Sequence, residues 1–347
     1  MSRTQLARRL VATSLFALIA TFFSSTFAAA QSVENFYKGK TVTVLAGFDA
    51  SGNAGQLVRT VAAHLGKHLP GNPTVIPQYR PGAGGIVQAN YIYNIAPKDG
   101  TVIGLLFDNL PMAQVIEPAG IKFDAKRFTI VGAVNHGDNA VIAVRSDHKA
   151  QTIQQARTQE VVIGATGPGT TGYVLANILN GTIGTRFRVV TGYTSGGTLL
   201  LALERGEIHA LARDYDSFVR EGPHLIKSGL INWMVQIGGK ADPGIPNVPL
   251  LNALAETDEQ RQVFELVTQP RRMGKAFIGP PGVPEDRVRA LQEAFANMLR
   301  DPLFIQEAER LGNAVETRSW KDVADVIHST VDTNAAIAAI TRKLIAR

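Results

Sequence analysis

The chain lacks cysteine entirely, since none of its 347 residues is Cys. Disulfide bonds, thiol catalysis and metal sites with thiolate ligands are therefore excluded. The sequence also has no G-x-S-x-G turn and no P-loop, so it lacks the nucleophile turn of serine hydrolases and the phosphate cradle of P-loop enzymes. Aromatic residues make up only 7% of the chain, which does not indicate a stacking platform for sugars or bases.

Long apolar runs are missing after residue 30, where none reaches the ~18 residues that a membrane span needs. The first 30 residues differ: three arginines come within nine positions, a mostly apolar stretch covers 10–27, and three alanines follow. This pattern predicts an export signal cleaved near Ala30, so that the mature chain begins near Gln31 and works in the periplasm. An uncleaved membrane anchor is the alternative interpretation.

Strong charge of either sign is missing as well. The net charge is +6, and the three arginines of the export signal supply half of it. Charges are interspersed without a Lys/Arg tract, which argues against nucleic acid as a partner. The remaining length is too great for one small core and is typical of two domains.

Short β-branched runs alternate with amphipathic stretches and Gly-rich turns along the chain. The alternation predicts an α/β fold with right-handed crossovers and a parallel sheet in its first part. We expect the first domain to comprise residues 31–136 plus 272–347 and the second to comprise 137–271, after a signal peptide of 1–30. The expected strands are 40–46, 74–77, 101–107, 161–163, 187–190, 208–212, 231–237 and a return strand at 275–278, with helices at 56–68, 86–95, 173–179, 198–205, 285–300 and 320–346.

Residues 161–179, with the sequence VVIGATGPGTTGYVLANIL, form the most informative unit. A β-branched run leads into a loop of Gly, Pro and Thr, and a helical pattern begins at Tyr173. Glycines let a ligand approach the backbone, Thr170 and Thr171 supply hydroxyl groups that can also cap the helix, and the first helical turn presents free N–H groups. The unit predicts an anion-binding loop; a tight turn that binds nothing is the alternative.

The same loop also matches the dinucleotide fingerprint, because residues 167–172 fit G-x-G-x-x-G. That fingerprint needs an acidic residue about 20 positions further on to bind the ribose. No Asp or Glu occurs between Tyr173 and Leu203, which weakens this interpretation. Arg186 or Arg188 would then have to face a 2′-phosphate.

Four polar loops follow the carboxyl ends of predicted strands, at 48–53, 107–109, 166–171 and 191–197. Ligands of open parallel sheets bind beyond these ends, so the loops predict a polar cleft lined by backbone. Carboxylates near such ends, including Asp108, Asp214 and Asp216, contact a ligand or cap a helix more often than they form an acid–base pair. Tyr193 and Tyr215 either line a pocket or lie in the core.

For two pairs of basic residues, a structural position without a bound ligand is the favoured interpretation. His64 and His68 are spaced for one helix face, but the HExxH glutamate and a third ligand are missing, so a surface or interdomain position is favoured over a metal site. Arg271 and Arg272 precede the return strand, and we favour a solvated pair over one that binds a ligand anion.

Several motifs, in this order and spacing behind an export signal, resemble a known family along almost the whole mature length. The chain resembles the Bug-type periplasmic solute receptors of tripartite tricarboxylate transporters. The motifs are YKGKTVTV at 37–44, RPGAGG at 80–85, APKDGT at 96–101, GPGT at 167–170, Tyr193 with Gly196, RGEI at 205–208 and GPPGVP at 279–284.

The resemblance implies a type II periplasmic-binding-protein-like fold, with two α/β domains and a ligand cleft between them. It implies a monomeric receptor, without enzyme activity, cofactor or metal, that closes on a small carboxylate and delivers it to the permease subunits of a membrane transporter. In the family, backbone N–H groups and ordered waters of the loops after the first strand and at 166–171 hold the ligand. The predicted ligand-binding residues are Phe48, Asp49, Ala50, Ser51, Gly52, Asn53, Phe107, Asp108, Thr166, Gly167, Pro168, Gly169, Thr170, Thr171, Tyr193, Ser195, Gly196, Asp214 and Tyr215.

Three positions depart from the family pattern. Gly55 or Gln56 stands where the first loop usually has Asp, Ala202 stands near another usual Asp, and Asp49 adds a carboxylate where a small apolar residue is usual. An added carboxylate disfavours a plain dianion and favours a ligand with an amino group or hydroxyls. The alternative functions are an exported NADP-dependent oxidoreductase that uses residues 167–172, and a ligand-sensing partner of a membrane kinase.

Overall fold

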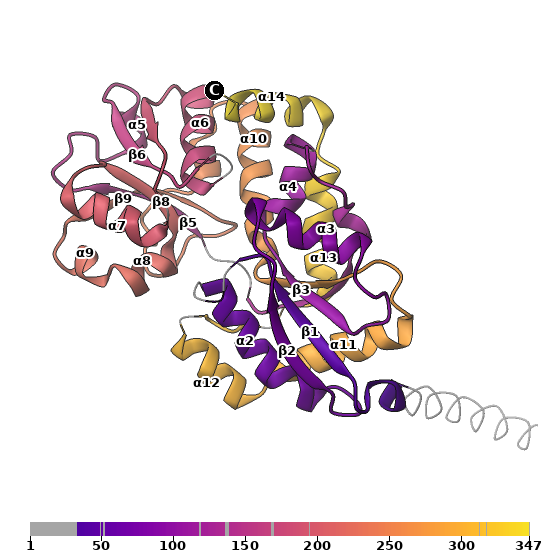
Figure 1. Cartoon of the computed structure of the whole chain (residues 1–347). Coiled ribbons are helices and arrows are strands. Elements are labelled where there is room, and N and C mark those ends of the chain that lie inside the picture. The colour runs from indigo at the N-terminus through magenta and orange to yellow at the C-terminus, as the bar shows by residue number, and fades with distance from the viewer. Residues whose placement is uncertain are drawn as a thin grey trace, which may run out of the picture.

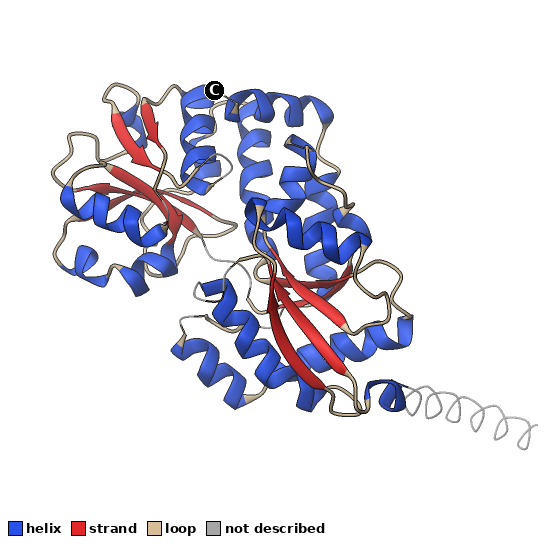
Figure 2. Ribbon diagram, viewed as in Figure 1, coloured by secondary structure: helices blue, strands red, loops and turns tan. Residues whose placement is uncertain are grey.

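The computed structural model describes residues 33–346 apart from 49, 51, 52, 118, 136–138, 168, 169, 194, 312 and 317. The described residues form two five-stranded sheets, each with helices on both faces (Figures 1 and 2). The predicted α/β fold of two sheet-and-helix units is therefore confirmed. The export signal, Asp49, Ser51, Gly52, Pro168 and Gly169 lie outside the described residues.

The first sheet has the strand order β2-β1-β3-β10-β4. β1 pairs in parallel with β2 and β3, as predicted, but β10 runs antiparallel to β3 and β4. The sheet is mixed because β10 reaches it from the second unit, so that Ala276 at its start pairs with Leu106 at the end of β3. The strands are β1 Thr41–Ala46, β2 Thr74–Tyr79, β3 Val102–Leu106, β4 Thr129–Ala133 and β10 Ala276–Gly279.

The second sheet has the order β7-β6-β8-β5-β9. β6 pairs in parallel with β7 and β8, whereas β5 is antiparallel to β8 and β9. Ala140 at the start of β5 therefore lies beside Asp214 and Ile237 at the ends of its neighbours. The strands are β5 Ala140–Arg145, β6 Val161–Gly164, β7 Phe187–Val190, β8 Ala210–Asp214 and β9 Ile231–Ile237.

Helices cover both faces of each sheet. The first unit carries α2 Asn53–Leu65, α3 Ile86–Asn94, α4 Asn109–Ile116, α11 Glu285–Met298, α12 Pro302–Arg310 and α13 Trp320–Val331. The second carries α5 Ile153–Ala156, α6 Thr171–Ile183, α7 Gly196–Arg205, α8 Tyr215–Glu221, α9 Pro223–Lys227 and α10 Asp258–Thr268. Short 3-10 turns are η1 Gly66–His68, η2 Ala83–Gly85, η3 Ala125–Arg127, η4 Leu251–Leu254 and η5 Gln269–Met273.

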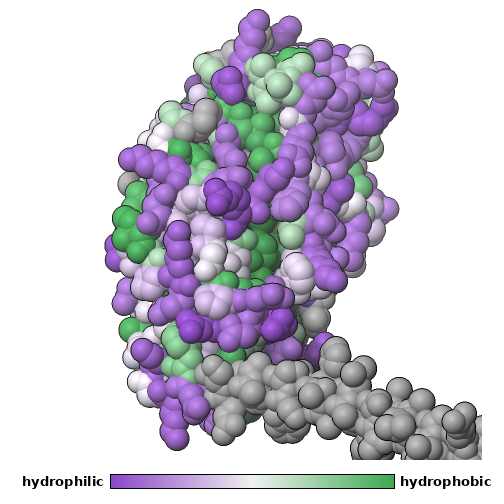
Figure 3. Space-filling model, turned by 90° about the vertical axis from the view of Figure 1, so that its right-hand side faces the viewer, coloured by the Kyte–Doolittle hydropathy of each residue, from purple (hydrophilic) through white to green (hydrophobic). Residues whose placement is uncertain are grey.

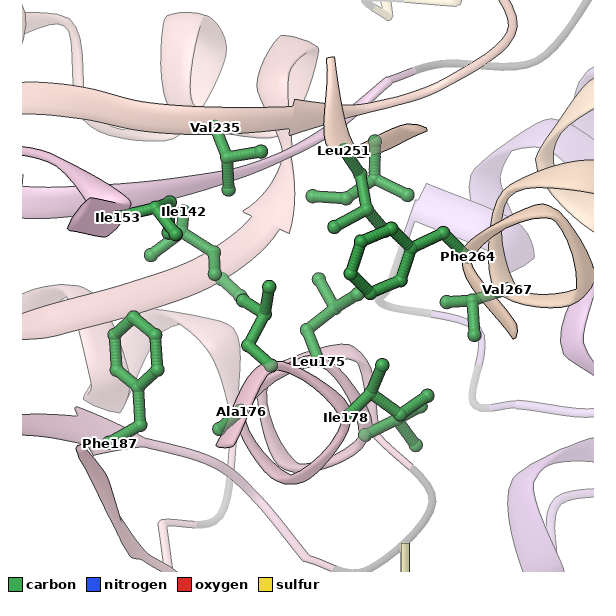
Figure 4. Close-up of a cluster of buried hydrophobic side chains, with 14 of the residues drawn as sticks. Ile142, Ile153, Leu175, Ala176, Ile178, Phe187, Val235, Leu251, Phe264 and Val267 are labelled. Atoms are coloured by element: carbon green, nitrogen blue, oxygen red, sulfur yellow. The ribbon is translucent and has the colours of Figure 1, made fainter. Parts of the chain in front are cut away.

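Alternation along the strands divides the buried residues between two faces. In β5, Ile142 and Val144 join one core cluster while Val141 and Ala143 join the opposite one, as the two-residue period of a strand requires. Leu175 of α6 points toward the second sheet within the first of these clusters (Figure 4). The sheets thus have the two buried faces expected of α/β units with helices on each side.

The C-terminal helix crosses between the two units. The predicted helix over 320–346 is two helices, α13 and α14 (Ala335–Ile345), separated at 332–334. α14 contacts α4 of the first unit and also packs on α6 and α10 of the second. Its Ile337 and Leu344 belong to the same buried cluster as α6 residues, and Figure 1 shows it beside α6 and α10. The two units are therefore joined by the packing of α14 as well as by the segments that connect them along the chain.

The outer surface is mainly hydrophilic on the face shown in Figure 3, where a narrow hydrophobic band runs between polar groups. Within the described part of the chain, no helix combines the length and apolar character needed to cross a bilayer.

Candidate functional site

A cavity of about 720 Å³ lies between the carboxyl edges of the two sheets. Phe48, Phe107 and Asp108, which follow β1 and β3, line it from the first unit. Thr166 and its loop line it from the second unit, after β6. Three of the four strand-end loops predicted to form a cleft, those after β1, β3 and β6, therefore meet in one cavity.

Most of the remaining lining is apolar. The side chains come from α3, α4, α6, α10, α14 and the strand ends β5 and β9. They include Ile86, Leu110, Met112, Ala113, Ile116, Ala140, Val174, Leu175, Ile237, Val267 and Ile345. The polar lining comes mainly from the loops after β3 and β6 and from Arg271, with Glu117 at the end of α4.

The loop after β6 leads directly into α6. Gly167, Thr170 and Thr171 line the cavity, and α6 begins at Thr171. Thr170 has extended backbone geometry at the helix start, but its hydroxyl donates to the Gly167 carbonyl oxygen at 2.7 Å and makes no capping bond. The expected capping by Thr170 is therefore wrong. The first turn of α6 keeps its positive dipole end toward the cavity.

Arg271 is the residue that connects the two edges. It lies on η5, and one terminal nitrogen, Nη1, is 2.5 Å from Asp214 Oδ1 and 3.5 Å from Asp108 Oδ2. Its Nη2 donates to the Thr171 hydroxyl at 3.0 Å. The side chain is only 16% exposed, so the favoured interpretation of Arg271 as solvated is wrong.

The neighbouring positive charges change the pKa of the Asp214 carboxyl group. Burial by itself would raise the pKa of Asp214, but the positive charge of Arg271, followed by that of Lys275 and the hydrogen bond from Arg271, outweighs burial. The pKa of Asp214 therefore lies below its ordinary value, and the carboxylate stays charged at neutral pH. Arg271, which lines the cavity, and Asp214, a predicted site residue that lies outside the lining, form a charge-assisted pair.

Two aromatic rings wall the cavity on the first unit. The ring centroids of Phe48 and Phe107 are 4.3 Å apart and the planes are tilted by 57°. Phe48 is 40% exposed although it is a large apolar residue. An exposed ring at the rim of a cavity is suited to cover the apolar part of a ligand.

Other predicted residues are placed elsewhere. Ala50 is exposed, and its carbonyl accepts a hydrogen bond from Arg59. Asn53 begins α2. Tyr193 and Tyr215 pack against the buried cluster on the opposite face of the second sheet, and Tyr215 makes an edge contact with Trp233. These aromatic rings lie outside the lining of the cavity.

The loop after β7 is also remote from the lining. Ser195 accepts from the Thr198 N–H in a capping box that starts α7, in which Gly196 is the first helical residue. Ala202, which stands near a usual family aspartate, is buried in the same helix. The structure therefore brings together the loops after β1, β3 and β6, while the loop after β7 serves to start a helix.

The candidates for dinucleotide and metal binding have other partners. Arg186 bonds the Thr158 carbonyl and Arg188 pairs with Glu160, both outside the lining of the cavity. Neither arginine is placed to face a 2′-phosphate in the cavity. His64 contacts Glu307 of α12 at 2.8 Å, and among the described residues no group of three or more His, Asp or Glu gathers as a metal site.

One contributor was missed from the sequence, and another was considered but not favoured. Helix α4 supplies Met112 and Ile116 to the lining, and η5 supplies Arg271. The apolar run after Asp108 contained the signal for α4. No local pattern marks Arg271 as a site residue, because its partners Asp108 and Asp214 are distant in the chain.

Two α/β units with a cavity between the carboxyl ends of their strands define the class of periplasmic binding proteins. The family model described as the tripartite tricarboxylate transporter family receptor matches residues 57–342. The chain belongs to this family, and the resemblance read from its motifs is confirmed. It is a solute receptor of a family whose members are periplasmic and which is not a family of enzymes.

Solved structures agree in fold. The chain is similar to a TctC solute-binding protein from Polaromonas, with 19% identity and a TM-score of 0.66 over 89% of this chain and 99% of that one. It is similar to R. palustris Rpa4515 with adipate, with 19% identity and a TM-score of 0.64 over 88% and 97% of the two chains. MatC (Rpa3494) from Rhodopseudomonas palustris with bound malate has 18% identity and a TM-score of 0.63 over 86% and 99%. No protein with a curated description matches the chain by sequence.

Proposed function

We propose that this receptor captures a small organic carboxylate in the cavity between its two sheets and delivers it to the permease subunits of a tripartite transporter. The observation that carries the proposal is Arg271, a guanidinium at the cavity beside Thr171 and the start of α6. Guanidinium groups, hydroxyl donors and helix N-termini all favour carboxylates. Two structural relatives contain adipate and malate, which are both carboxylates.

The ligand-binding residues in this proposal are Phe48, Phe107, Asp108, Arg271 and the loop at 166–171. The loop contributes hydroxyl and backbone donors, Arg271 contributes charge, and the two rings cover the ligand body. Ala50, after β1, and Asn53, at the start of α2, would approach the ligand on closure.

Hinge closure would supply the specificity of capture. We infer domains of 31–136 plus 272–347 and of 137–271, with the chain passing between them near 134–139 and 269–275. Ligand contacts from both domains would favour the closed state, because only differential affinity for that state can shift the equilibrium. α14 follows the first domain in this division but packs on α6 and α10, so it would form part of the hinge.

The proposal extends to the cellular setting. Residues 1–30 would direct export and be cleaved near Ala30, and the mature receptor would work as a monomer in the periplasm. It would bind its solute without chemistry and without a cofactor.

Binding of carboxylates by wild-type protein and two variants tests the proposal. A panel of mono- and dicarboxylates should contain members that raise the melting temperature, since a ligand at 100 times its Kd adds ~2.7 kcal/mol to stability. Arg271→Gln should weaken binding of those members by about tenfold, or about 1.4 kcal/mol, because it removes a charged hydrogen-bond donor. Isothermal titration calorimetry would measure both.

Arg188→Gln is the matched control, since Arg188 also pairs with one carboxylate but on the exposed edge of the second sheet. It should bind the panel as the wild type does. A panel in which no carboxylate binds, or equal affinity of wild type and Arg271→Gln, would contradict the proposal.

A further inference from the structure

Five apolar side chains from four helices line the cavity and form an apolar wall: Met112 and Ile116 of α4, Val174 of α6, Val267 of α10 and Ile345 of α14. Met112, Ile116, Val174 and Val267 are each less than one-tenth exposed. These side chains come from helices of both units, and the acidic residue Glu117, which follows Ile116 at the end of α4, lines the cavity next to them. A ligand that reaches this wall must bring apolar surface to it, because a polar group there would lose hydration without a partner.

The size of the cavity exceeds what a short hydroxy acid requires. Its volume of about 720 Å³ lies within the ~300–1,000 Å³ typical of pockets for drug-sized ligands. Phe48 and Phe107 add aromatic surface at the rim. The cavity therefore has room for an extended apolar body beside the carboxylate.

The charged side chains of the described lining disfavour a second carboxylate on the ligand. Arg271 is the sole Lys or Arg among the described lining residues, whereas Asp108 and Glu117 are acidic. Arg271 already faces both Asp108 and Asp214. A second carboxylate on the ligand would find no further cation in this lining and would be repelled by the acidic residues.

We propose that the solute of this receptor is a monocarboxylate with an extended alkyl or aryl body. Its carboxylate lies at Arg271 and Thr171, and its body lies along the apolar wall formed by α4, α6, α10 and α14. The inference rests on the proposed function, because it specifies which carboxylates the same cavity accepts.

Two ligands of equal carbon number and different charge test the inference on the purified mature protein. Octanoate and octanedioate differ only in the second carboxylate at the far end. Octanoate should bind at least about tenfold more tightly than octanedioate, measured by calorimetry. Affinity should also rise from butanoate to octanoate by about fourfold per methylene, which corresponds to about 0.8 kcal/mol per buried CH₂.

A substitution in the apolar wall tests whether the ligand body binds along this wall or elsewhere on the protein. Ala113 of α4 lines the cavity, and Ala113→Phe would fill space along the wall. Octanoate should lose about tenfold in affinity while butanoate binds as before. Ala296→Phe is the matched control, because Ala296 is likewise a half-buried alanine on a helix but lies outside the lining.

The outcomes distinguish the two proposals. Equal or tighter binding of octanedioate would overturn the inference and leave the carboxylate receptor standing. Affinity independent of chain length would do the same. If no carboxylate binds at all, both proposals fail, and if Ala113→Phe does not fold, the ligand series decides by itself.

Discussion

Arg271 is a single guanidinium shared by groups from both sheets. Asp214 ends β8 of the second sheet, Asp108 follows β3 of the first, and Thr171 starts α6. The guanidinium compensates the negative charge of both carboxylates and donates a hydrogen bond to Thr171. The consequence is that the charge state of this cluster affects stability as well as binding.

Asp214→Asn should lower the free energy of unfolding at pH 7 by about 1 kcal/mol, the value of a charge-assisted hydrogen bond reduced for partial exposure. Because the folded pKa of Asp214 lies below its unfolded value of about 3.9, this stabilisation is present above that value and is lost as pH falls through the folded pKa. The difference between wild type and variant should therefore narrow at pH 3. Urea unfolding at both pH values would measure it.

Glu160→Gln, which removes an exposed partner of Arg188, should change stability little at either pH. A constant effect of Asp214→Asn from pH 7 to pH 3 would show that its pKa is not lowered by folding.

Single residues of the site were predictable where they follow a strand directly. Thr166, Thr170 and Asp108 were placed from strand ends and Gly-rich turns, and they line the cavity. Tyr193 and Tyr215 also follow strands but turn toward the opposite face of their sheet. A strand end identifies the edge of a sheet, whereas the face toward which a side chain turns depends on the packing of helices that come later in the chain.

At the scale of elements, β3 and α3 show how closely a helix approaches its sheet. Gly104 of β3 lies beneath α3, and a Cβ at this position would be 2.4 Å from Gln88 Nε2 and 2.6 Å from Ile92 Cδ1. The Gln88 side chain is buried and donates to the Leu45 carbonyl oxygen. A methyl group here would therefore disturb both the packing and a buried hydrogen bond.

Gly104→Ala should lower the free energy of unfolding by about 1–3 kcal/mol, the usual cost of overpacking a core. Gly279→Ala in β10 of the same sheet is the matched control, because its nearest atoms to a Cβ are 3.6 Å away. The control should be neutral or slightly stabilising. Chemical denaturation of the three proteins would measure the difference, and equal stability of the two variants would contradict the account.

The positions of most strands followed from the sequence, but the order of the strands did not. β9 has the predicted bounds of 231–237, and the predicted strand at 208–212 is displaced by two residues to Ala210–Asp214. The local pattern fixes where a strand lies in the chain because burial alternates with a period of two. The antiparallel insertion of β10 between β3 and β4 depends on contacts between segments more than a hundred residues apart, which no local pattern contains.

At the scale of the whole molecule, α14 joins the two units by packing against helices of both. Arg342 of α14 donates from Nε to the Ile116 carbonyl at 2.5 Å and from Nη2 to the Val115 carbonyl at 3.1 Å. These carbonyls belong to the last turn of α4, where a cation also interacts favourably with the helix dipole. The other side of α14 packs on α6 and α10.

Arg342→Met should lower the free energy of unfolding by about 1–2 kcal/mol, because it removes two hydrogen bonds to the end of α4 and keeps the apolar stem of the side chain. Arg289→Met, which removes an exposed i,i+4 partner of Glu285, should cost less than about 0.5 kcal/mol. Urea unfolding followed by circular dichroism would compare them. A loss for Arg342→Met no larger than that of the control would mean that α14 does not depend on these bonds.

The sequence predicted the class of fold correctly, but it did not predict how the C-terminal helix α14 connects the two units. Two α/β units, a cleft at the strand ends and the receptor family all followed from pattern and motif. The crossing of α14 did not, since its apolar residues Ile337 and Leu344 join a cluster that contains residues of α4 as well as of α6 and α10. These partners come from segments far away in the chain, which no local pattern contains.

The absence of thiols has a practical consequence at the rim of the cavity. Ala119 is exposed and lines the cavity, just after α4. A cysteine introduced there would be the single thiol of the protein and would accept one environment-sensitive fluorophore without further substitutions. Such a labelled receptor would turn occupancy of the cavity into an optical signal, and fractionated extracts could then be screened for the solute before its identity is known.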